Sequence, residues 1–148
     1  MRGRRSVRVS LSVVALAAGV AVGGVWTASV GATTKPHLVV TPTKGLKNGS
    51  SVKVGGSGFT PGDTLFLVEC LAKAKGQAGC RVVGIPPSVT VNSKGQFKTT
   101  TIKVYTGKVG NGVCGTKKSN LNNCAVSAGN ATGGDSAVAL IQFVLPKH

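Results

Sequence analysis

The chain contains 148 residues, of which 18 are Lys or Arg and only three are Asp or Glu, so its formal charge at pH 7 is +15. Three carboxylates and two histidines are too few for most acid–base or nucleophilic active sites, and the sequence contains no phosphate-binding loop and no metal-ligand cluster. The composition therefore argues against an enzyme and favours a protein that binds a partner.

Residues 1–32 have the arrangement of a secretory signal peptide. Four arginines between positions 2 and 8 precede an uncharged run, residues 9–30, which ends in the small-residue tripeptide Val30-Gly31-Ala32. We expect cleavage after Ala32, secretion of the mature protein and no stable membrane insertion after cleavage. The alternative is a membrane anchor that is not cleaved, because about 20 apolar residues are enough to span a bilayer.

Residues 33–148 are predicted to form one mature domain. A chain of this length has no room for a second domain, and it buries roughly 60% of its unfolded surface. The leader contains four of the arginines, so the mature segment keeps 14 basic residues against three acidic ones and has a formal charge of +11. We expect this domain to be a monomer.

Short runs rich in Val, Thr, Leu, Phe and Ile alternate with clusters of Gly, Pro, Asn and Lys along the mature segment, and no helical period is visible. Turns are expected at residues 47–49, 61–63, 92–95 and 133–135, where these residue types supply the required backbone angles. Seven or eight strands predict an all-β, immunoglobulin-like sandwich, with a closed β-barrel as the alternative. The predicted strands span residues 38–41, 51–55, 64–70, 81–83, 88–91, 96–104, 124–127 and 137–145.

The four cysteines form two sequence pairs, each enclosing nine residues: Cys70 with Cys80, and Cys114 with Cys124. An even number of cysteines in a small exported domain indicates disulfides. Three pairings are possible, and the two local loops are the most economical, because neighbouring strands bring Cα atoms within bonding distance. A zinc site is the alternative, but nine-residue gaps lack the usual close ligand pairs, so no metal is expected.

The three carboxylates have structural interpretations. Asp63 follows a Pro-Gly pair and Asp135 a Gly-Gly pair, so both are expected to cap turns. Glu69 lies on the face of the predicted strand opposite to Phe66, Val68 and Cys70. We expect it to be solvated or paired with a lysine.

A series of short motifs follows in order along the mature segment. The first half contains Val-Thr-Pro at 40–42 with Gly45-Leu46, Val-Lys-Val at 52–54 with Gly-Ser-Gly-Phe at 56–59, and the Cys70 to Cys80 spacing. Ser-Val-Thr-Val at 88–91 leads to a Thr-rich strand, and residues 124–143 contain a Gly-rich turn. Over residues 38–145 this order resembles the neocarzinostatin family of enediyne-antibiotic apoproteins, which includes macromomycin and actinoxanthin.

The resemblance implies a seven-stranded Greek-key sandwich with a cleft that is partly floored by the first disulfide. The cleft of the family holds an enediyne chromophore without a covalent bond, so a small hydrophobic ligand is expected and no other cofactor. Because that chromophore cleaves DNA, the resemblance also implies an antimicrobial role and an association with DNA. Carried over by position, the cleft would be lined by Phe66, Val68, Cys70, Ala72, Cys80, Ile85, Ala125, Ser127 and Gly129.

The chain departs from the family pattern in this expected cleft. Members have glycine two residues before the first cysteine and often have aromatic residues near positions 72 and 85, where this chain has Val68, Ala72 and Ile85. Aromatic faces are a major way to hold a flat polycyclic ligand. The departures leave the identity of the ligand open, and the alternative is that Phe66, Val68 and Ile85 fill the core.

The excess of lysine suggests a second function. A net charge of this size attracts polyanions such as DNA, teichoic acids or anionic lipid headgroups. Lys73 and Lys75 in the first cysteine loop, with Lys117 and Lys118 in the second, would form the strongest patch if the loops were adjacent. Without interleaved aromatic residues, DNA binding is expected to be weak, salt-sensitive and nonspecific. The competing hypothesis is therefore a secreted cationic immunoglobulin-like module that binds polyanions or acts at the cell surface.

Overall fold

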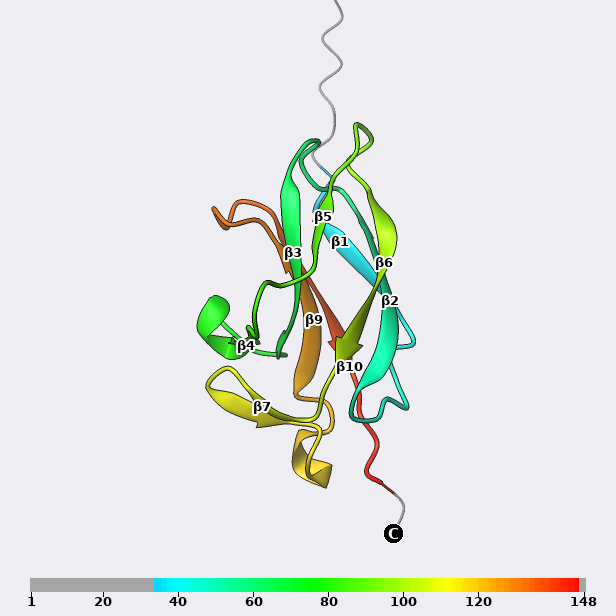
Figure 1. Cartoon of the computed structure of the whole chain (residues 1–148), viewed down its shortest axis with the longest axis vertical. Helices are drawn as coiled ribbons and strands as arrows, with labels where there is room; N and C mark the ends of the chain where they lie inside the picture. The colour runs from blue at the N-terminus through cyan, green and yellow to red at the C-terminus, as the bar shows by residue number, and fades with distance from the viewer. Residues whose placement is uncertain (1–33, 147–148) are drawn as a thin grey trace, which may run out of the picture. The chain divides into compact units, whose positions relative to one another are not determined.

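Ten strands and two 3₁₀ turns carry the fold of residues 34–146, the part of the chain that this computed structural model describes (Figure 1). The predicted leader and its cleavage site lie outside the described residues. The turns are η1 (Gln77–Gly79) and η2 (Lys118–Asn120), and neither is long or apolar enough to cross a membrane. The strands are β1 (His37–Thr41), β2 (Ser50–Ser57), β3 (Thr64–Leu71), β4 (Cys80–Arg81), β5 (Ser88–Thr90), β6 (Phe97–Val104), β7 (Gly107–Val109), β8 (Gly112–Cys114), β9 (Cys124–Gly129) and β10 (Ser136–Ile141).

The strands form two antiparallel sheets around a shared core, beside the small β7–β8 hairpin. One sheet has the order β1-β2-β6, and the other has the order β10-β9-β3. Both β4 and β5 pair with the remaining edge of β3, at successive positions along it, and together they occupy a fourth strand position. The sheets thus have seven strand positions, which confirms the predicted sandwich and excludes one closed barrel.

Alternation along the strands separates a core face from an outer face. On β3, Leu65 and Leu67 are buried in the core, whereas Phe66 and Val68 are half-buried on the opposite face. Because Phe66 and Val68 are outside the core cluster and Ile85 is 92% exposed, the alternative that these three residues fill the core is wrong. The core is mainly aliphatic, with three aromatic side chains from Phe59, Phe97 and Phe143.

The predicted turn at residues 92–95 is present and is fixed by its own side chains. Asn92 Oδ1 accepts hydrogen bonds from the N–H groups of Lys94 and Gln96, at 2.9 and 3.1 Å. Gly95 has a φ of 72°, and its carbonyl accepts a hydrogen bond from the Phe59 N–H at 3.1 Å. The turn therefore holds the start of β6 against the Phe59 segment.

The structure differs most from the predicted strands at three places. The strand predicted at residues 81–83 is limited to β4 (Cys80–Arg81), and residues 82 and 83 belong to the irregular connection to β5. The β7–β8 hairpin occupies a region where no strand was expected, and its tip is tied to the first cysteine loop by a hydrogen bond from the Asn111 N–H to the Ala78 carbonyl, at 3.0 Å. Strand β10 ends at Ile141 rather than at residue 145, and beyond it Phe143 forms a single parallel bridge with Leu46.

Candidate functional site

A cleft of about 680 Å³ lies over the outer face of the β3–β9 pair. Its floor consists of Phe66, Val68 and Cys70 from β3 with Ser127 and Gly129 from β9. The sheet register pairs Phe66 with Gly129 and Val68 with Ser127, and the two-residue period of a strand puts these positions on one face. Because Ser127 and Gly129 are small, this face keeps open space instead of a filled layer of side chains.

Three segments form the walls of the cleft: the first cysteine loop, the connection between β4 and β5, and the β9–β10 turn. Two hydrogen bonds that involve carboxylates hold the β9–β10 turn in place. Asn130 Nδ2 donates to Asp63 Oδ2 at 2.8 Å, and the Thr60 N–H donates to the Asp135 carboxylate. Asp63 and Asp135 thus fix turns beside the cleft.

The two disulfides join Cys70 to Cys80 and Cys114 to Cys124, which confirms the predicted local pairing. The first connects directly paired positions of β3 and β4, and both of its cysteines line the cleft. It therefore closes the loop that forms one wall. Both cysteines of the second disulfide are fully buried.

The residues predicted to line the cleft are mostly brought together, with two exceptions. Ile85 is 92% exposed on the β4–β5 connection and does not line the cleft. Ala125 shares the face of Ser127 but is fully buried where it pairs with Cys70, so it is not in the lining either. The other predicted residues lie in the lining of the cleft: Phe66, Val68, Cys70, Ala72, Cys80, Ser127 and Gly129.

Sequence reasoning missed several lining residues. Val138 pairs with Ser127 and lies on the same face of the sheet, so strand alternation in β10 would have identified it. Val82 and Pro86 come from the irregular connection after β4, although Val82 lay in the strand predicted at residues 81–83. The rim residues lie in turns and loops that no periodic signal describes: Gln77, Asn130, Ala131, Thr132 and Gly133.

The four lysines predicted to bind polyanions do not all line one hollow. Lys73 and Lys75 line a second hollow, of about 410 Å³, whereas Lys117 and Lys118 at η2 do not line it. In Figure 1 the β7–β8 hairpin lies between η2 and the loop before β4. Asn120 Oδ1 fixes the η2 loop by accepting hydrogen bonds from the N–H groups of Thr116 and Lys117, at 2.9 and 2.8 Å.

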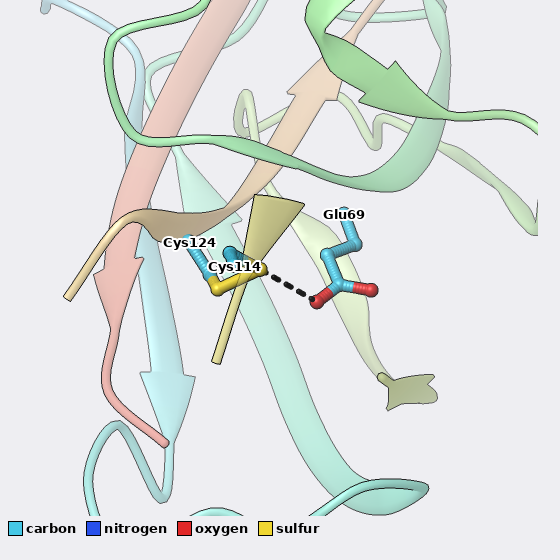
Figure 2. Close-up of side chains that lie close together, drawn as sticks. All are labelled: Glu69, Cys114 and Cys124. Atoms are coloured by element: carbon cyan, nitrogen blue, oxygen red, sulfur yellow. Dashed lines mark hydrogen bonds between the residues drawn. A yellow bond between two sulfur atoms is a disulfide. The ribbon is translucent and has the colours of Figure 1, made fainter. Parts of the chain in front are cut away.

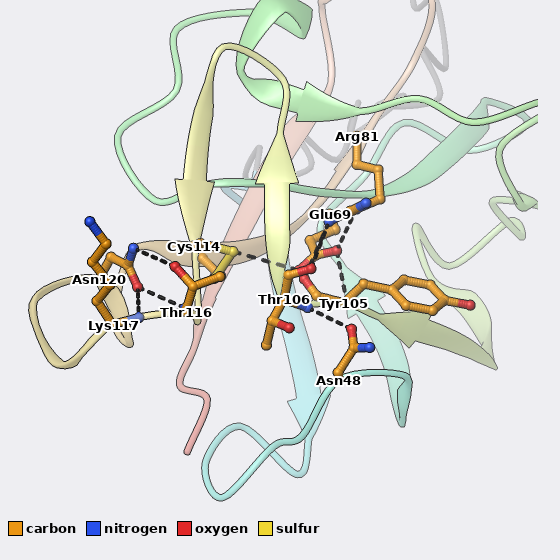
Figure 3. The surroundings of a disulfide bond; sticks show 10 residues. Asn48, Glu69, Arg81, Tyr105, Thr106, Cys114, Thr116, Lys117 and Asn120 are labelled. Atoms are coloured by element: carbon orange, nitrogen blue, oxygen red, sulfur yellow. Dashed lines mark hydrogen bonds and ion pairs between the residues drawn. A yellow bond between two sulfur atoms is a disulfide. The ribbon is translucent and has the colours of Figure 1, made fainter. Parts of the chain in front are cut away.

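Glu69 is the one buried charged residue of the described chain, at 4% exposure. Its Oε2 accepts hydrogen bonds from Arg81 Nε at 3.2 Å and from the Tyr105 N–H at 3.0 Å (Figure 3). Burial raises the pKa of Glu69, and the Tyr105 N–H and the Arg81 charge oppose that increase. The expectation that Glu69 is solvated or paired with a lysine is wrong, because alternation on β3 turns it away from the outer face.

Glu69 also approaches the second disulfide. Its Oε1 lies 3.8 Å from Cys114 Sγ (Figure 2). The carboxylate and the sulfur atoms of Cys114 and Cys124 lie within 4.8 Å of one another, which is close enough for metal ligands. Since the sulfurs are bonded to each other, they are not available as thiolate ligands.

Comparison with known proteins identifies relatives over this whole domain. A family model described as the neocarzinostatin family matches residues 38–143. Macromomycin from Streptomyces macromomyceticus is 31% identical over 110 residues, which are 74% of this chain and 75% of that protein. The antitumor antibiotic C-1027 apoprotein from Streptomyces globisporus is 33% identical over 107 residues, 71% of each chain. A solved structure of macromomycin matches with a TM-score of 0.58 and 28% identity, covering 74% of this chain and 99% of its own.

Proposed function

Because the chain belongs to the neocarzinostatin family, we propose that it is a carrier that holds a small hydrophobic ligand in the cleft over β3 and β9. The family consists of non-enzymatic apoproteins, and the chain is a binding protein of this kind rather than an enzyme. The ligand is an enediyne-like antibiotic or another small hydrophobic molecule. With an antibiotic as its cargo, the loaded protein is antimicrobial.

The cleft itself is the observation that supports this proposal. Its volume of about 680 Å³ lies within the range of roughly 300–1,000 Å³ that is usual for small-molecule sites. Phe66, Val68 and the first disulfide offer an apolar floor, and Asn130 and Thr132 offer polar groups at the rim. Such a surface holds an apolar molecule by removing its faces from water, and the rim orients it.

A titration with an uncharged fluorescent probe, dansyl-aminohexanoic acid methyl ester, tests the proposal. We expect saturable binding and a ligand-dependent rise in the melting temperature. Ser127→Trp fills the floor and is expected to abolish binding, whereas Thr101→Trp, on the exposed side of β6, keeps it. Equal loss of binding in both variants, or no saturable binding to the wild type, would refute the carrier function.

Secretion after removal of residues 1–32 is part of the proposal. The order of charged, apolar and small residues in this segment supports it. N-terminal sequencing of protein from the culture medium should begin at Thr33. Recovery of the chain only from membranes, with residues 1–32 still attached, would instead support the anchored alternative.

A second candidate function is weak binding of DNA or another polyanion by exposed lysines. It is favoured by the charge balance: the one salt bridge among residues 34–146 joins Arg81 to Glu69, so the lysines there have no acidic partner in that range. Binding to duplex DNA should fall steeply with salt and weaken in Lys117→Gln/Lys118→Gln. Salt-independent binding would contradict it.

A further inference from the structure

We infer that the ligand of this protein carries an anionic group, and that this group binds in the hollow lined by Lys73 and Lys75. The inference rests on the proposed carrier function, because it concerns the same ligand. The hollow has a volume of about 410 Å³ and lies beside the cleft. A carboxylate, sulfate or phosphate attached to an apolar body is the chemical class that fits both spaces.

Fixed backbone contacts hold the hollow open. One side is the first cysteine loop, and the other is formed by the tip of the β7–β8 hairpin and by Asn123. The Ala72 N–H donates to the Asn123 carbonyl at 2.8 Å, and the Asn111 N–H donates to the Ala78 carbonyl at 3.0 Å. These two hydrogen bonds join the first cysteine loop to the opposite side of the hollow, so the two walls keep their positions relative to each other.

The hollow is electropositive because its lysines are not neutralised. Within the described residues, all three carboxylates have other partners: Glu69 binds Arg81, Asp63 binds Asn130, and Asp135 binds the Thr60 N–H. None of them lines the hollow, whereas Lys73 and Lys75 both do. The side-chain amides of Asn111 and Asn123 add uncharged donors to the same lining.

The hollow and the cleft share a wall. Leu71 and Ala74 line both spaces, so the loop between them separates the apolar floor from the two lysines. Ala74 ends in a single methyl group, and an arm from a ligand at the Cys70 and Ala72 end of the floor would cross it to reach the lysines. The two spaces therefore suit one molecule with an apolar body and a negatively charged arm.

Two probes with the same dansyl body separate this inference from the carrier function. One is dansyl-aminohexanoic acid, whose arm ends in a carboxylate, and the other is its uncharged methyl ester. In low-salt buffer the acid should bind the wild type about fivefold more tightly than the ester, a modest factor because exposed ion pairs are weak. Lys73→Gln/Lys75→Gln should remove this preference and leave the affinity for the ester unchanged.

A matched variant controls for the general charge of the protein. Lys98→Gln/Lys103→Gln removes two exposed lysines from β6 and should keep the fivefold preference. Equal binding of acid and ester to the wild type would overturn the anionic subsite while the carrier function stands. So would an equal loss of preference in both lysine variants. Failure of both probes to bind the wild type would refute the carrier function itself, and the inference with it.

Discussion

Glu69 and Arg81 stand opposite each other on β3 and β4 and form an ion pair in which Nε and Oε2 are 3.2 Å apart. The neighbouring pair of residues is Cys70 and Cys80, so the ion pair and the first disulfide join the same two strands. The guanidinium also lies 5.6 Å from the Tyr105 ring centroid (Figure 3). The ion pair thus connects the edge of the cleft to the segment that follows β6.

The first prediction concerns the dependence of stability on pH. The pKa of Glu69 is higher in the folded protein than in the unfolded chain, mainly because of burial, so the folded state binds its proton more readily. The contribution of Glu69 to stability is full below the ordinary glutamate pKa and is lost as the pH rises through the raised pKa. The unfolding free energy of the wild type minus that of Glu69→Gln should fall across this window. Urea denaturation at a series of pH values measures it, and a flat difference would contradict the assignment.

The second prediction concerns the partner of that carboxylate. Arg81→Met should lower the unfolding free energy at neutral pH by about 2 kcal/mol, because it leaves a buried charge without a counter-charge. The double variant Glu69→Gln/Arg81→Met should lose less unfolding free energy than Arg81→Met alone, since no unpaired charge remains. Denaturant unfolding of the single and double variants measures both values. Additive losses would show that the two side chains act independently.

The third prediction separates backbone conformation from steric space at two glycines. Gly62 and Gly95 both have positive φ, at 87° and 72°. A Cβ at Gly62 meets nothing within 4 Å, whereas one at Gly95 would lie 2.8 Å from the Phe59 carbonyl oxygen. Gly62→Ala should lower the unfolding free energy by about 1 kcal/mol, because alanine is strained at this backbone conformation. Gly95→Ala should lower it clearly more, because the close contact adds to the same strain. Melting temperatures give the order, and equal losses would contradict the contact.

The fourth prediction concerns the order in which the disulfides are reduced. Cys80 is partly exposed and lines the cleft, while Cys114 and Cys124 are fully buried. A phosphine reductant should therefore break the Cys70–Cys80 bond first, and a bound ligand should slow that step. Partial reduction, alkylation and peptide mapping follow both bonds, and earlier cleavage of the buried one would be the opposite result.

Strand alternation and turn residues predicted most of the fold because they are local. The sandwich and both disulfide pairings are confirmed, and Leu65 and Leu67 alternate with Phe66 and Val68 as a two-sided sheet requires. The β7–β8 hairpin was missed because each of its strands is three residues long and has no alternating apolar pattern.

The cleft depends on contacts that local patterns do not encode. Carried over by position, Ile85 was expected in the lining, but its irregular connection leaves it exposed, and Val82 and Pro86 line the cleft in its place. That Lys73 and Lys75 line a hollow which Lys117 and Lys118 do not line likewise depends on how two loops pack. Neither result has a periodic signal in the sequence.

The most direct test of the carrier function is native mass spectrometry of the mature protein purified from the culture medium of its own producer. We expect a chain with two disulfides and a bound small molecule that is released by collisional activation. Ser127→Trp produced in the same way should lack that molecule. If the wild type, like Ser127→Trp, appeared only at the mass of its own bare chain, the proposal that the cleft over β3 and β9 carries a ligand would be contradicted.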